Sequence, residues 1–107
     1  MKNQKITSLK EALMELQQRN EQPHLRNMTR VTSVIGDYLK IADAFLDMAK
    51  ELDEEAFEKV SSFIASQKEE ADWCVNIASY PEMLSIAKRH TIDIINKTIA
   101  LIDELNR

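Results

Sequence analysis

Residues 28–52 read MTRVTSVIGDYLKIADAFLDMAKEL, and this stretch decides the fold. Its apolar residues recur at alternating spacings of three and four, the heptad pattern of a helix that packs along its length against other helices. More apolar residues flank this stripe on both sides, so a helix from about His24 to Leu52 is expected to contact at least two neighbours. The stripe consists of Met28, Val31, Ile35, Tyr38, Ala42, Phe45, Ala49 and Leu52.

Two later stretches repeat the pattern and predict two more long helices. Asp53 is placed to cap the first of them, with Glu54 and Glu55 in its first turn, where the helix dipole favours anions. Pro81 is placed to begin the second. The first stripe comprises Phe57, Val60, Ile64, Gln67, Ala71, Cys74 and Ala78, and the second comprises Leu84, Ala87, Thr91, Ile94, Thr98, Leu101 and Leu105.

A shorter helix is expected before Pro23. Ser8 and Glu11 have the spacing of a capping box, which predicts that this helix begins at Ser8 and is about 20 Å long, against about 37–43 Å for the other three. The chain of 107 residues has one Gly and two Pro, which also favours helix throughout. The prediction is therefore an all-α fold in which residues 1–107 form a single domain: an antiparallel up-down helical bundle of three long helices plus a short N-terminal helix.

The short helix is expected to leave one end of the bundle uncovered, near Leu52 and Asp53. Exposed apolar surface of this kind usually marks an interface. We expect a partner there, either a second copy of the chain in a homodimer or a helix of another protein laid into the groove. The alternative is that the three long helices close on themselves. The predicted partner-binding residues at this end are Phe45, Leu46, Met48, Leu52, Phe57, Phe63, Ile99 and Ile102.

Trp73 and Tyr80 complete the predicted partner-binding set at the opposite end. They lie beside the main stripe of their helix, together with Ile77, and we expect Trp73 to pack beneath the N-terminal helix. If that helix detaches, these side chains form an aromatic docking surface, and Trp and Tyr are typical of binding hot spots.

Little in the sequence points to chemistry. One Gly and one Cys exclude a glycine-cradled phosphate site and a disulfide scaffold. Cys74 lies on a core stripe and is expected to be buried and inert, while His90 and Asp93 lie on flank positions that do not favour a metal site. We therefore expect no catalytic residue, no cofactor and no metal.

Charge and targeting signals complete the interpretation. The formal net charge of −4 opposes general nucleic-acid binding, although Arg19, Arg26 and Arg30, with Lys88, Arg89 and His90, could make the Pro23 and Pro81 end basic. The absence of a signal segment or membrane span, with a lone cysteine, predicts a cytoplasmic protein.

The favoured function is a non-enzymatic protein-protein interaction module: a small regulator, inhibitor, immunity-type protein or chaperone that masks a partner. The alternative is a small-ligand or nucleic-acid-binding regulator that uses the basic end.

Overall fold

The computed structural model describes residues 4–21 and 28–106 of the chain. These residues form four α-helices, α1 (Gln4–Glu21), α2 (Met28–Ala49), α3 (Glu54–Ile77) and α4 (Leu84–Leu105). A short 3-10 helix, η1 (Pro81–Met83), precedes α4. No strand occurs in either described range, so the predicted all-α class is confirmed.

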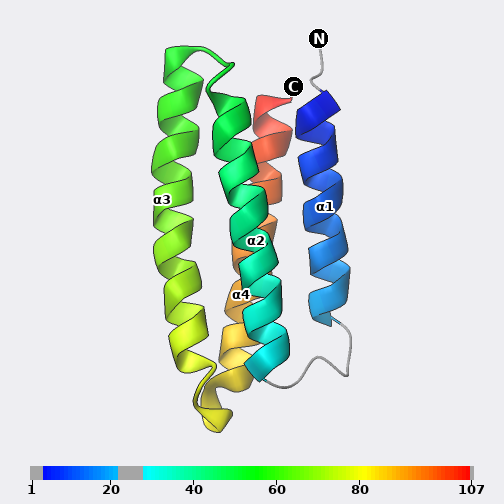
Figure 1. Cartoon of the computed structure of the whole chain (residues 1–107), viewed down its shortest axis with the longest axis vertical. Helices are drawn as coiled ribbons and strands as arrows, with labels where there is room; N and C mark the ends of the chain where they lie inside the picture. Colours follow the sequence, from blue (N-terminus) through cyan, green and yellow to red (C-terminus); the bar gives the residue numbers. More distant parts are fainter. Residues whose placement is uncertain (1–3, 22–27, 107) are drawn as a thin grey trace.

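The four helices lie along the long axis of a molecule that measures 44 × 22 × 17 Å (Figure 1). α1 packs against α2 and α4, and α3 packs against the same two helices. Ion pairs join Lys5 to Glu51 at 3.1 Å and Arg19 to Asp37 at 2.5 Å. Residue numbers therefore rise along α1 as they fall along α2, which is the register of neighbours that run in opposite directions.

The local signals at the start of α3 act as predicted. The Asp53 carboxylate accepts a hydrogen bond from the backbone N–H of Ala56 at 2.8 Å, and Glu54 and Glu55 occupy the first turn. Pro81 takes the first position of η1, and α4 follows from Leu84. The predicted cap of α3 is thus confirmed, and Pro81 begins a helical segment one 3-10 turn ahead of α4.

The predicted start of the N-terminal helix at Ser8 is wrong. α1 begins at Gln4 and has 18 residues, compared with 22 in α2, so Ser8 is an exposed residue within the helix. A capping box contributes about 1 kcal/mol, whereas burial of an isoleucine side chain contributes about 2 kcal/mol. Ile6 is 3% exposed, and its burial outweighs the local signal for a helix start at Ser8.

The expectation of an uncovered end is also wrong, for the same reason. Figure 1 shows the start of α1 beside the turn between α2 and α3 and beside the C-terminal end of α4. Ile6 belongs to the same core cluster as Phe45, Met48 and Ile102, all of which are buried. The chain's own N-terminal helix fills the place that the sequence interpretation left for a partner.

The predicted stripes form the core. Every described member of the α2 stripe from Val31 to Ala49 is buried, whereas Leu52 is partly buried. In α3 and α4 the stripes are buried except at their outer ends, where Phe57, Leu84 and Leu105 are partly buried. The heptad spacing therefore identified the inward face of three helices correctly.

Tyr38 and Thr98 place a polar contact inside this core. The two hydroxyl oxygens are 2.8 Å apart, and Thr98 donates its own proton to the carbonyl of Ile94 at 2.9 Å. Tyr38 must therefore be the donor to Thr98, because a hydroxyl has a single proton. Burial raises the pKa of Tyr38 to about 12.

Gln67 is the weak point of the α3 stripe. The residue is buried, and its side-chain oxygen Oε1 has no hydrogen-bond partner. An unsatisfied buried acceptor costs about 1–3 kcal/mol relative to an apolar side chain of the same shape. We therefore expect Gln67 to lower the stability of the fold.

Shortening Ile6 tests the closure of the bundle by α1. We expect Ile6→Ala to lower the free energy of unfolding by about 2 kcal/mol, because the variant leaves a cavity in the core. Urea denaturation followed by far-UV circular dichroism measures this change. Exposed Thr7 supplies the control, since Thr7→Ala should shift stability by no more than about 0.5 kcal/mol. Equal effects of the two substitutions would show that the first turn of α1 is not packed.

Replacing Gln67 tests the cost of the unsatisfied oxygen. Gln67→Met keeps the length of the side chain and removes the polar atom, so the free energy of unfolding should rise by about 1 kcal/mol. The same substitution at exposed Gln18 is the matched control and should be close to neutral. A loss of stability in Gln67→Met would mean that the amide is satisfied and contributes to the core.

Candidate functional site

The ten predicted partner-binding residues do not form one surface. Phe45, Met48 and Ile102 are buried in the core, and only Trp73 and Tyr80 are exposed. The remaining five are partly buried and pack against the core: Leu46, Leu52, Phe57, Phe63 and Ile99. Three of the eight residues predicted near the α2–α3 turn are thus enclosed, and the exposed pair belongs to the other end of α3.

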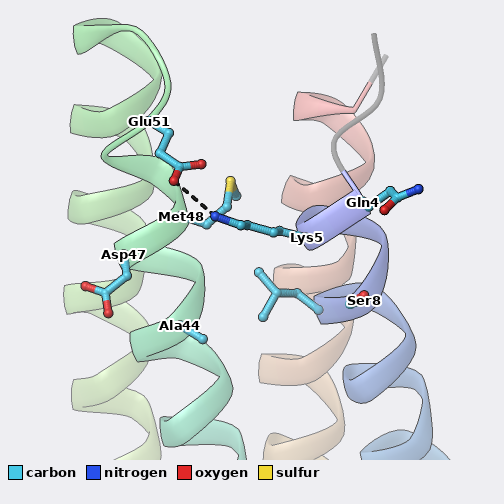
Figure 2. A pocket seen from close by; sticks show the side chains of 8 residues that line it. Gln4, Lys5, Ser8, Ala44, Asp47, Met48 and Glu51 are labelled. Carbon is cyan, nitrogen blue, oxygen red and sulfur yellow. Dashed lines mark hydrogen bonds and ion pairs between the residues drawn. The ribbon is translucent and has the colours of Figure 1, made fainter.

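A cleft of about 580 Å³ lies between α1 and α2, near the start of α1 (Figure 2). Lys5 and Glu51 reach across it, and their ion pair leaves both side chains more than half exposed, at 66% and 56%. The cleft is lined by Gln4, Lys5, Ser8, Leu9, Ala44, Asp47, Met48 and Glu51. An ion pair between groups this exposed contributes little to stability. It also brings no nucleophile or base into the cleft, so we interpret the cleft as the boundary between two packed helices.

A second cleft, of about 340 Å³, lies between α3 and α4 and combines aromatic and acidic side chains. It is lined by Glu69, Glu70, Trp73 and His90. The rings of Trp73 and His90 meet edge to face, with their centroids 5.0 Å apart and their planes at 73°. The Nε2 atom of His90 lies 2.5 Å from Oε2 of Glu70, which fixes the imidazole on the side facing α3.

The expectation that Trp73 packs beneath the N-terminal helix is wrong. α1 packs between α2 and α4, whereas Trp73 projects from α3 toward His90 of α4. The indole therefore stays 43% exposed. The sequence pattern showed that Trp73 lies beside the core stripe but held no signal for which neighbouring helix it faces.

Two further exposed hydrophobic residues lie at the same end of the bundle. Ile86 in the first turns of α4 is 43% exposed, and Tyr80, between α3 and η1, is 58% exposed. The contact of Trp73 with His90 and the ion pair of Lys59 with Glu104 show that α3 and α4 run in opposite directions, and this register places Ile77 of α3 level with Ile86. We call Trp73, Ile77, Tyr80, Ile86 and His90 the Trp73 surface.

Cys74 is buried, as predicted, and it is a free thiol. Burial raises its pKa to about 11, and the charge of Glu70 adds to the rise. A thiol in this state is not a nucleophile near neutral pH. Thr91 donates a hydrogen bond to the carbonyl of Ala87 at 2.8 Å. The side chains of Cys74 and Thr91 are both buried parts of the core.

The basic end and the metal candidates are only partly described. Arg19 is paired with Asp37, Lys88 also has an interaction partner, and His90 is occupied by Glu70. Arg26 and the side chain of Arg30 lie outside the described residues. Among the residues that the structure describes, no three of His, Cys, Asp or Glu gather in a way that would hold a metal ion.

No family model, curated protein or solved structure shows a significant match to this chain. Within residues 4–21 and 28–106, none of the helices combines the length and the apolar content needed to cross a bilayer.

Sequence reasoning missed Glu69 and Glu70 of the cleft between α3 and α4, and Ile86 of the Trp73 surface. Glu70 precedes Trp73 by three residues and Ile86 precedes His90 by four, the spacings that place side chains on one face of a helix. These spacings show from the sequence which side chains share a helix face. The sequence does not show that the two faces meet, because that depends on the register between α3 and α4.

The environment of Cys74 predicts slow thiol chemistry in the native protein. We expect Ellman's reagent at pH 8 to label Cys74 only after unfolding in urea. An exposed cysteine at position 79, made by Ser79→Cys in a Cys74→Ala chain, is the control and should react at once. Rapid native labelling of Cys74 would contradict the buried thiol.

The same pKa shift predicts a pH dependence. The thiol ionises near 9 in the unfolded chain and about 11 in the folded one, so the unfolded state loses its proton first. The free energy of unfolding should therefore fall as the pH rises from about 9 to about 11. Cys74→Ala should weaken this fall, and an unchanged slope would contradict it.

Proposed function

We propose that this protein is a non-enzymatic protein-protein interaction module, built on an antiparallel up-down helical bundle, that binds a partner protein through the Trp73 surface. The observation that carries the proposal is the exposed indole of Trp73, the single tryptophan of the chain, with Ile86 and Tyr80 at the same end. Tryptophan and tyrosine are enriched in the residues that dominate binding energy. Three large apolar side chains left in water at one end of a small domain are typical of an interface.

The state of the reactive groups supports a binding role over catalysis. The thiol of Cys74 is enclosed in the core, and the imidazole of His90 is hydrogen-bonded to a carboxylate and meets an indole edge to face. A nucleophile and base pair requires the two groups within hydrogen-bond reach of each other and of a substrate. The free cysteine also supports a cytoplasmic location, because reducing compartments keep thiols unpaired.

The partner we propose is another protein. Self-association remains a prediction, but it was inferred from an end of the bundle that α1 fills. The basic-end alternative receives less support, because Arg19 and Lys88 already have interaction partners within the protein.

Site-specific photo-crosslinking tests the proposal. The photoreactive amino acid p-benzoylphenylalanine is placed at position 80 or 86 in the cells that make the protein, and adducts are detected by mass. We expect one heavy adduct from each position, because both side chains lie at the interface. Position 14 is the matched control, since Met14 is exposed to a similar degree on α1, and it should give no adduct.

Two results would contradict the proposal. Equal labelling from positions 14, 80 and 86 would show that contact is random. An adduct of twice the 12.3 kDa chain mass would identify a second copy in place of a partner protein. Trp73→Ala in the same chains should abolish the specific adducts.

A further inference from the structure

The α3–α4 cleft has a composition that selects a particular ligand. A half-exposed indole forms part of its wall, and Glu69 and Glu70 bring carboxylates to the same opening. Resting on the proposed function, we propose that this cleft holds an arginine side chain of the partner protein, with its guanidinium against Trp73 and paired with the carboxylates. Cations bind over aromatic rings, most strongly over tryptophan.

The charge at the cleft favours a cation. Glu69 forms no ion pair with any other described residue, and neither does Asp93, which the register places level with Glu70. Glu70 uses Oε2 for His90, and a carboxylate can accept further hydrogen bonds. Of the positive groups nearby, Lys68 is paired with Asp43 at 2.7 Å, and Lys88 also has an interaction partner. Arg89 and Lys97 of α4 are exposed and do not line the cleft.

Three of the four side chains that line the cleft contact one another before any ligand arrives: Glu70, His90 and Trp73. Glu70 fixes the ring of His90, and that ring in turn supports the indole of Trp73 in its edge-to-face position. A preformed site costs less conformational entropy on binding than one that must be ordered. Arginine suits this site better than lysine, because its planar guanidinium can stack on a ring and bond a carboxylate through two N–H groups at once.

The surface beyond the cleft adds an apolar requirement. Ile77 lies four residues after Trp73 on α3, and Ile86 lies level with it on α4. Residues four apart on a helix are separated by about 6 Å. The partner segment should therefore carry an apolar side chain about one helical turn from its arginine.

A designed probe with one matched control tests the arginine site. The probe is a helical alanine-glutamine peptide with one arginine and, four residues later, one leucine; in the control peptide, neutral citrulline replaces the arginine. Binding to the intact, ¹⁵N-labelled protein is followed by chemical shifts, which locate the contact and measure millimolar affinities. We expect the arginine probe to bind about 10-fold more tightly than the citrulline probe and to shift the Trp73 indole signal.

Variants of the protein separate the contributions. Trp73→Leu keeps an apolar side chain but removes the π-face, and it should bring the two probes close to equal affinity. Glu69→Gln should lower the affinity for the arginine probe about 3-fold and leave the citrulline probe unchanged. Glu58→Gln is the control and should change neither affinity, because Glu58 is an exposed carboxylate four residues after the start of α3 at Glu54, away from the cleft.

The possible failures are distinguishable. Equal affinities of the two probes for the unmodified protein, or no shift at Trp73 with either, would overturn the arginine site. In that case, crosslinks from positions 80 and 86 would still support the proposed protein-protein interaction, without a site for a cation. An arginine preference without those crosslinks would instead overturn the proposed function.

Discussion

Burial of Ile6 is the interaction on which the architecture depends. It extends α1 back to Gln4, and this extension carries the helix past the level of Phe45 and Met48 to the turn between α2 and α3. Without these turns the apolar side chains at that end of α2 and α4 would face water. The ion pair of Lys5 with Glu51 lies at the same end, but both partners are largely exposed and contribute less than the isoleucine.

The parts of the fold that could be predicted are those set by local chemistry or by periodicity. The stripe from Val31 to Ala49 is buried because its spacing follows one face of a helix, and Asp53 caps α3 because its carboxylate reaches a free backbone N–H. The start of α1 could not be predicted in this way. Ser8 and Glu11 carry a strong local signal, and only the position of Ile6 in the tertiary structure overrides it.

The candidate site shows the same division. The spacing in the sequence placed Trp73 beside the core stripe, yet its neighbour is decided by how four helices associate in space. Because α1 packs between α2 and α4, the indole of Trp73 contacts His90 and is partly exposed to solvent. The eight residues predicted near the α2–α3 turn were chosen by assuming an absent helix, whereas Trp73 and Tyr80 were chosen for their chemistry, and these two are the ones that are exposed.

The hydrogen bond between Tyr38 and Thr98 has a consequence for how the bundle can move. It joins α2 to α4 across the interior, at a single height along the bundle axis. Sliding α4 by one helical turn, about 5.4 Å, would leave the phenol of Tyr38 without an acceptor in an apolar interior. Hydrophobic contacts tolerate such axial slippage, because one aliphatic side chain can replace another. The phenol of Tyr38 does not tolerate this movement, so its hydrogen bond with Thr98 favours one axial register of α2 and α4.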